Sequence, residues 1–220
     1  MFASIKRLFG SASSVRDEGH ALSTWAKAEG HAFKRVQDKA GGGFVVESNQ
    51  GWRVEWGASQ RPYIQGKELR FRCDTGVSGD VQLIMITKVL AQALESDVFA
   101  RYTNAMQTQI DNTLPDEMRW LAMHPRVVMS HSAVLSKRFA LFCNAQAVAD
   151  QWLDSEMSQV IERAAISWWM DGLMLVLTLN RGIVTMRMSG QSLEQAQLKL
   201  VSELFAKIAS RLRAVSQAAA

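Results

Sequence analysis

Apolar residues recur at three- and four-residue steps in four segments of the chain, the spacing of one face of an amphipathic helix. The longest ridge begins at Leu83 and ends at Ile110, which predicts a helix of about 30 residues that Asp80 caps. A shorter helix is expected over residues 116–123, between two prolines. The other three predicted long helices cover residues 14–39, 145–164 and 192–215.

Strict alternation of apolar and charged residues marks two strands, residues 52–56 and 68–73. Alternate side chains of a strand point to opposite sides, so these strands predict an antiparallel meander with one packed face and one charged face. Three consecutive glycines at residues 41–43 are interpreted as a flexible connector that ends the first helix. Further strands are expected over residues 44–47, 126–130, 139–143, 173–179 and 183–188.

These elements predict an α+β fold in which antiparallel sheets are packed by long amphipathic helices. An arrangement of helix, hairpin and helix occurs over residues 14–110 and again over residues 145–215, which suggests two similar subdomains. The predicted division is an N-terminal amphipathic segment over residues 1–13, a first subdomain over residues 14–123 and a second over residues 124–220.

Composition indicates a folded protein without a strong electrostatic preference. Of the 220 residues, 48% are hydrophobic and 21% are charged, and 25 Lys and Arg against 21 Asp and Glu give a net charge of +4. So small and scattered an excess disfavours nucleic acid as a partner. Cys73 and Cys143 lie far apart and are interpreted as free thiols in a reducing cytosol. No signal peptide or membrane-spanning run is found, so a cytoplasmic location is expected.

The first ten residues form a small amphipathic pattern, with apolar residues at helical spacing beside Lys6 and Arg7. Such a segment suits a membrane surface or a groove on a partner. The alternative is a frayed terminus or a helix docked on its own domain, and we favour it because nine residues bury little area. We therefore expect residues 1–10 to add nothing measurable to membrane binding.

The charged face of the meander is the best candidate for chemistry. It carries Arg53, Arg70 and Arg72, and the long loop that joins its strands adds Arg61 and Tyr63. Guanidinium groups bind carboxylate or phosphate through paired hydrogen bonds, which makes a small anion a candidate ligand. The alternative is a lattice of cross-strand ion pairs with the glutamates of the same face, and the residue pattern favours it.

No catalytic or cofactor motif is present, and whether the protein is an enzyme stays open. The four histidines lie at spacings that cannot build a metal site, so neither a metal nor a cofactor is predicted. Long apolar helices and the adjacent Trp168 and Trp169 favour a binding or scaffold protein that has a protein partner or self-associates. The alternative is an enzyme or sensor that binds a small anion at the arginines.

Several short strings of residues resemble those of uncharacterised proteobacterial proteins. They cover residues 52–57, 59–61, 63–64, 68–70 and 117–121. The order of strand, helix, hairpin and helix over residues 139–212 is similar to that of other bacterial families of unknown function. The resemblance implies no activity, cofactor or site residue.

Overall fold

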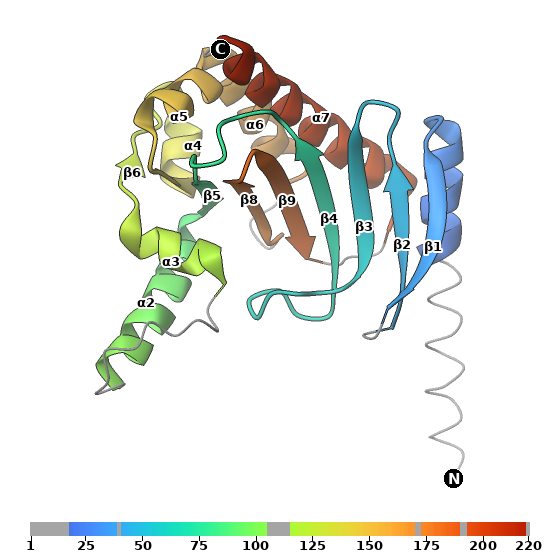
Figure 1. Ribbon diagram of the computed structural model, residues 1–220, viewed down its shortest axis with the longest axis horizontal. Helices are drawn as coiled ribbons and strands as arrows, with labels where there is room; N and C mark the ends of the chain where they lie inside the picture. Colours follow the sequence, from blue (N-terminus) through green and yellow to red (C-terminus); the bar gives the residue numbers. More distant parts are fainter. Residues whose placement is uncertain (1–17, 39–40, 105–114, 170–172, 190–192, 219–220) are drawn as a thin grey trace.

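In the computed structural model, one antiparallel sheet of nine strands carries helices on both faces, so the predicted α+β fold is confirmed (Figure 1). The structure describes residues 18–38, 41–104, 115–169, 173–189 and 193–218. The strand order is β1-β2-β3-β4-β9-β8-β5-β7-β6. The strands are β1 (Ala32–Asp38), β2 (Gly41–Glu47), β3 (Trp52–Ala58), β4 (Lys67–Asp74), β5 (Leu83–Thr87), β6 (Arg126–Val127), β7 (Phe139–Cys143), β8 (Leu175–Asn180) and β9 (Ile183–Ser189). A helix over residues 18–28 precedes α2 (Lys88–Asn104), α3 (Asp116–Met123), α4 (Ala133–Arg138), α5 (Gln146–Trp152), α6 (Ser155–Ser167) and α7 (Gln195–Ala218).

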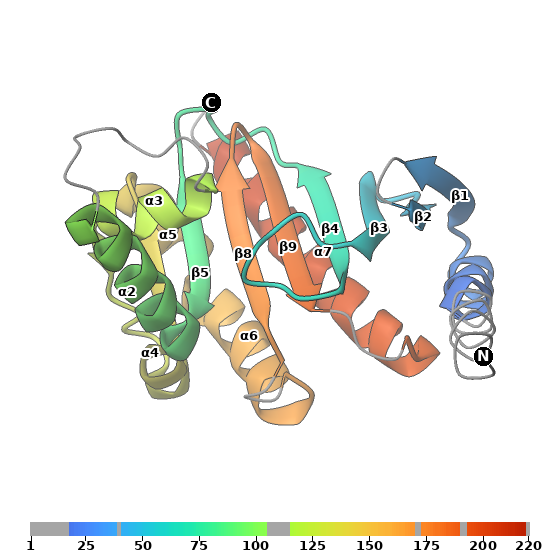
Figure 2. The ribbon, with the colours of Figure 1, turned by 90° about the horizontal axis from the view of Figure 1, so that it is seen from below.

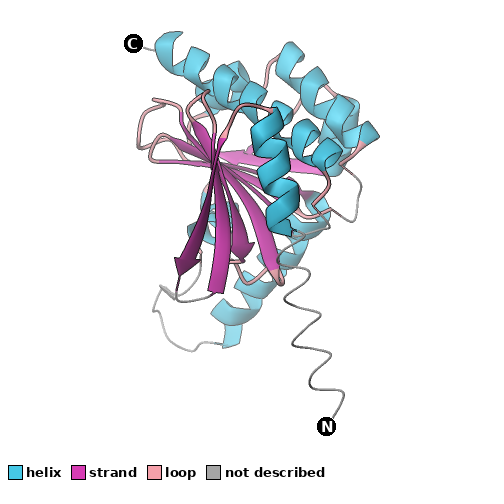
Figure 3. Ribbon diagram, turned by 90° about the vertical axis from the view of Figure 1, so that its right-hand side faces the viewer, coloured by secondary structure: helices cyan, strands magenta, loops and turns pink. Residues whose placement is uncertain are grey.

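The main hydrophobic core lies on one face of the sheet, under α7 and the shorter helices α4 to α6. Trp52 of β3 and Phe71 of β4 meet Phe205 of α7, with ring centroids 6.3 and 5.2 Å apart. These residues occupy the side of the meander that alternation predicts to be packed. Figure 3 shows the strands fanning out with the twist that is usual for antiparallel sheets.

The opposite face is covered only in part. α2 and α3 pack on the β5, β7 and β8 end, where Ile84, Ile86 and Phe142 meet Met118 and Trp120 in a second apolar cluster. No helix among the described residues packs on β2, β3, β4 and β9 on this side. We call that part the open face. In Figure 2 the loop between β3 and β4 crosses in front of β9, and α7 passes behind the strands.

The predicted helix over residues 14–39 is wrong beyond residue 28, because Gly30 adopts a positive φ of 70° and the chain returns as β1. Glycines 41–43 are not a connector. They begin β2 and pair in register with the end of β1, so that Val36 lies opposite Gly43. The helical spacing of Phe33 and Val36 is therefore misleading, since β-pairing rather than local periodicity sets the conformation here. The Phe33 ring stacks on Phe44, with centroids 5.6 Å apart.

The predicted helix over residues 83–110 is also wrong at its start. Leu83–Thr87 is β5, which pairs with β7 on one side and β8 on the other. A short apolar run that is buried on both faces has no polar positions, so its periodicity does not distinguish strand from helix. Asp80 lies in the turn before β5 and caps no helix, and residues 105–110 lie outside the described part of the chain.

Residues 145–164 form two helices, α5 and α6, instead of one. The Asn144 side-chain oxygen accepts from the Gln82 N–H (2.8 Å) and its amide donates to the Asp80 carbonyl (2.7 Å), which ties the end of β7 to the start of β5. Asp154 caps α6 by accepting from the Met157 N–H (2.9 Å). The strand predicted over residues 126–130 is limited to the two residues of β6. The segment 1–13 and residue 192, where the last helix is expected to begin, lie outside the described residues.

Strands from both predicted subdomains share the one sheet, because β4 pairs with β9 and β5 pairs with β7 and β8. The division at residue 124 stays a prediction. Trp168 and Trp169 do not split between core and solvent as an extended segment would place them. They follow the end of α6 and stack with centroids 6.4 Å apart, Trp169 is buried, and Trp168 packs against the core. Self-association accordingly gains no support from this pair and stays a prediction.

Candidate anion-binding cleft

A cavity of about 490 Å³ opens on the open face, and we call it the arginine cleft. Its floor comes from β4, β9 and β8, and its walls come from the β3–β4 loop and α3. The strand register brings the floor residues side by side. Arg70 lies opposite Arg187, Arg72 lies opposite Thr185, and Thr185 lies opposite Thr178. The lining residues are Gln60, Arg61, Arg70, Arg72, Glu117, Trp120, Thr178, Asn180, Arg181, Ile183, Thr185 and Arg187.

Arg181 enters the cleft from the tight turn between β8 and β9. Asn180 pairs with Ile183, so Arg181 and Gly182 are the two central residues of a hairpin turn. Both have positive φ, 52° and 74°, as a type I′ turn requires. The sequence predicts this hairpin at the same residues.

One buried carboxylate fastens the β3–β4 loop over the sheet. The Tyr63 hydroxyl donates to Oε1 of Glu117 on α3 at 2.6 Å, and Arg61 Nε donates to the same oxygen. At the start of the loop, the Ser59 hydroxyl lies 3.2 Å from Oε2 of Glu68. Burial and the adjacent Glu117 carboxylate raise the pKa of Tyr63 well above its ordinary value, so its hydroxyl stays protonated and donates.

A second carboxylate lies beneath the two central arginines. Glu68 Oε1 accepts from Arg187 at 2.6 Å and from Arg70 at 3.4 Å, and the Glu68 side chain is only 3% exposed. Glu55 pairs with both Arg53 and Arg70. The ion-pair lattice predicted for this face is therefore present, although it is largely buried rather than solvated.

The cleft nevertheless holds a surplus of positive charge. Burial, followed by repulsion from Arg187, Arg72 and Arg53, lowers the pKa of Arg70 to about 10. Burial also lowers the pKa of Arg187, although Glu68 opposes the shift. Repulsion among the neighbouring arginines thus adds to the effect of burial on Arg70, as expected where several cations lie close together.

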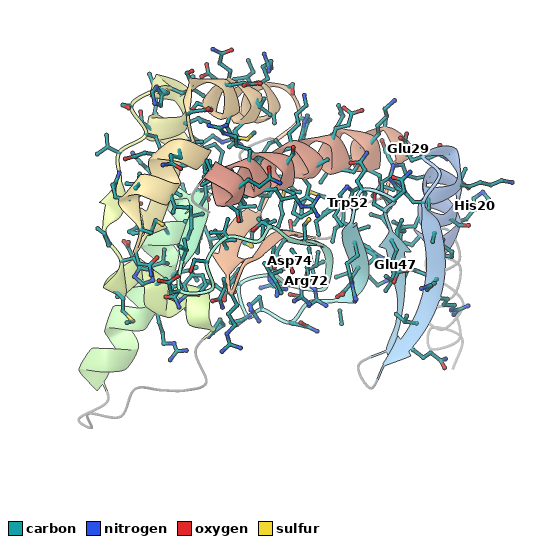
Figure 4. All side chains as sticks on the ribbon, turned by 45° about the horizontal axis from the view of Figure 1, so that its top comes forward. His20, Glu29, Glu47, Trp52, Arg72 and Asp74 are labelled. Carbon is teal, nitrogen blue, oxygen red and sulfur yellow. The ribbon has the colours of Figure 1, made fainter. Side chains whose placement is uncertain are left out.

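The side chains of two cleft arginines, Arg72 and Arg181, form no ion pair or hydrogen bond with any described residue, whereas those of Arg61, Arg70 and Arg187 each pair with a glutamate. With Arg53 included, six arginines lie on this face, and Glu55, Glu68 and Glu117 form ion pairs with four of them, which leaves two arginines without an ion pair. Figure 4 shows Arg72 and Asp74 close together on β4, and Trp52 close to α7.

The structure brings three of the five predicted residues, Arg61, Arg70 and Arg72, into one cleft. Arg53 lines two other hollows instead, and Tyr63 binds Glu117. Sequence reasoning missed Arg181, Arg187, Glu117 and Trp120. Alternation along residues 183–187 places Arg187 on the polar side of its strand, but only the pairing of β9 with β4 places it beside Arg70.

The described residues contain no group of three or more His, Cys, Asp or Glu side chains arranged to hold a metal ion. None of the helices in this part of the chain is both long and apolar enough to cross a membrane.

No family model matches the chain, and no curated protein matches it. Among solved structures, the chain is similar to the crystal structure of the mycobacterial trehalose monomycolate transport factor A, TtfA. The TM-score is 0.52 at 14% identity, over 90% of this chain and 96% of that one. At this identity the similarity shows a shared fold over nearly the whole of both chains. The resemblance to proteobacterial proteins stays a prediction.

Proposed function

We propose that this chain is a binding module whose arginine cleft takes a small anion. The observation that carries the proposal is the pair Arg72 and Arg181, which line a concave site without a carboxylate partner among the described residues. Unpaired guanidinium groups beside other cations are unfavourable until an anion arrives, so binding relieves repulsion as well as forming hydrogen bonds.

Three supporting features concern the frame of the site. The β3–β4 loop is held by buried Glu117, the floor is three paired strands, and Arg181 extends from a tight turn. Because the backbone around the site is held in this way, only the side chains of Arg72 and Arg181 need to be ordered on binding. A binding role is also compatible with the name of the structural neighbour, a transport factor. A cytoplasmic location belongs to the same proposal.

Thermal denaturation of the full chain with chloride, acetate, phosphate and citrate at matched ionic strength tests the proposal. We expect at least one multivalent anion to raise the melting temperature saturably, since a ligand at 100 times its Kd adds about 2.7 kcal/mol of stability. Arg72→Gln and Arg181→Gln should each abolish most of the response. Arg35→Gln is the matched control, because Arg35 is an exposed strand arginine outside the cleft.

Either of two results would overturn the proposal. One is that no anion shifts the melting temperature beyond the effect of ionic strength. The other is that Arg72→Gln and Arg181→Gln respond to the stabilising anion as strongly as Arg35→Gln does.

A further inference from the structure

The charge balance of the arginine cleft suits a ligand with more than one negative charge. Glu117, Glu68 and Glu55 already pair with Arg61, Arg70 and Arg187, and Arg72 and Arg181 remain without an ion pair among the described residues. A monovalent carboxylate would compensate only one of these two charges. A dianion removes most of the remaining repulsion, so charge favours it over a carboxylate.

The free donors of the cleft indicate the shape of that anion. Arg72 and Arg181 offer two guanidinium forks, and the Thr185 hydroxyl beside Arg72 has no hydrogen-bond partner among the described residues. A carboxylate has two oxygens and satisfies one fork. A phosphate group offers three acceptor oxygens, which serve two forks and a hydroxyl together.

We infer that the arginine cleft takes the phosphate group of its ligand, a tetrahedral dianion held by Arg72, Arg181 and Thr185. This inference rests on the proposed function and names the class of anion. Arg61, Arg70 and Arg187 act as positioning residues, because their guanidinium groups are engaged by glutamates and supply positive potential rather than free donors.

The phosphate group has two possible sources, a free phosphate ion or a phosphomonoester. A second hollow, of about 300 Å³, adjoins the cleft and shares Trp120, Asn180 and Arg181 with it. Met123, which is 72% exposed, lines this hollow but not the cleft. The organic part of a monoester bound at Arg181 would lie against Trp120 and Met123, whereas a free phosphate would leave this hollow to water.

Isothermal titration calorimetry at pH 7.5 and fixed ionic strength tests the inference on the full chain. The probes are phosphate, sulfate, malonate, acetate and phenyl phosphate. We expect the two tetrahedral dianions to bind about tenfold more tightly than acetate and more tightly than malonate, which has the same charge but planar carboxylates. Arg72→Gln and Arg181→Gln should each weaken phosphate binding about tenfold, and Arg35→Gln should leave it unchanged.

Phenyl phosphate distinguishes the two sources. Tighter binding than inorganic phosphate, with the gain removed by Met123→Ser, identifies a monoester, and equal binding identifies free phosphate. Met123→Ser changes an exposed side chain, so it should leave folding intact.

Failure of this inference and failure of the proposed function give different results. Acetate or malonate binding as tightly as phosphate, with the same dependence on Arg72 and Arg181, overturns this inference and leaves the proposed function standing. Absence of binding by every anion, or phosphate binding that survives both arginine variants, overturns both.

Discussion

Arg70 of β4 and Arg187 of β9 lie directly opposite each other in the register of two neighbouring strands. Like charges at such positions destabilise a sheet. Here Glu68 Oε1 contacts both guanidinium groups, at 3.4 and 2.6 Å, from a position that is almost fully buried. The Glu68 carboxylate thus reduces the repulsion between Arg70 and Arg187. A bound anion would reduce the repulsion that remains.

Removing that carboxylate should destabilise the fold. Glu68→Gln leaves Arg187 buried without a counter-charge, and we expect the free energy of unfolding in urea to fall by about 3 kcal/mol. Glu203→Gln, on an exposed position of α7, is the control and should change it by less than about 0.5 kcal/mol. A Glu68→Gln protein as stable as the control would show that the pair needs no compensation.

The hydroxyl of Tyr63 should hold the β3–β4 loop in place. Tyr63→Phe keeps the ring but removes the 2.6 Å hydrogen bond to Glu117, a bond to a charged acceptor that contributes about 1.5–3 kcal/mol. We expect amide exchange to accelerate at Ser59 and Ile64, whose N–H groups donate within the loop. Exchange in β7 should be unchanged, and equal protection of the loop in both proteins would contradict a fastening role for Glu117.

Stability should fall below neutral pH because of His31. This ring lies between Trp25 and Trp52, with centroids 5.6 and 5.0 Å away, and burial lowers its pKa below 6.5 while Glu29 partly opposes the shift. The unfolded chain therefore takes up a proton first as the pH falls through 6.5, and stability decreases until the folded pKa is passed.

His31→Gln should accordingly lose part of the decrease in unfolding free energy between pH 7.5 and pH 5.5. His20→Gln, at the exposed position labelled in Figure 4, should retain it. A pH dependence that is identical in wild type and His31→Gln would assign the effect to other groups.

Two neighbouring glycines of β2 should differ sharply in their tolerance of a methyl group. A Cβ at Gly43 would lie 2.8 Å from the Trp56 carbonyl oxygen, whereas a Cβ at Gly42 meets no atom within 4 Å. We expect Gly43→Ala to reduce the free energy of unfolding by about 1–3 kcal/mol, because β2 and β3 would have to separate. Gly42→Ala should be close to neutral in the same urea titration. Equal effects would place these glycines outside the paired strand.

The sequence by itself determines the meander and the last hairpin. The pleat sends alternate residues to opposite sides, so the pattern of residues 52–56 and 68–73 specifies a packed side and a charged side without knowledge of any partner. Asn180, Arg181 and Gly182 likewise mark the hairpin turn, because a short polar break with a glycine separates two apolar runs. For this reason the sequence alone predicts the charged face and three arginines of the cleft.

Only the tertiary structure decides β1, β5 and the completed cleft. The first four residues of β5, Leu83 to Ile86, are all apolar and do not show whether the run is strand or helix, and the central place of β5 in the sheet follows from pairing with β7 and β8. Arg187 and Glu117 join Arg70 across 117 and 47 positions of sequence, through the β4–β9 register and the packing of α3. Those contacts depend on which strands pair and which helix covers them. Strand pairing and helix packing follow from the burial of apolar residues along the whole chain, and local residue spacing does not specify them.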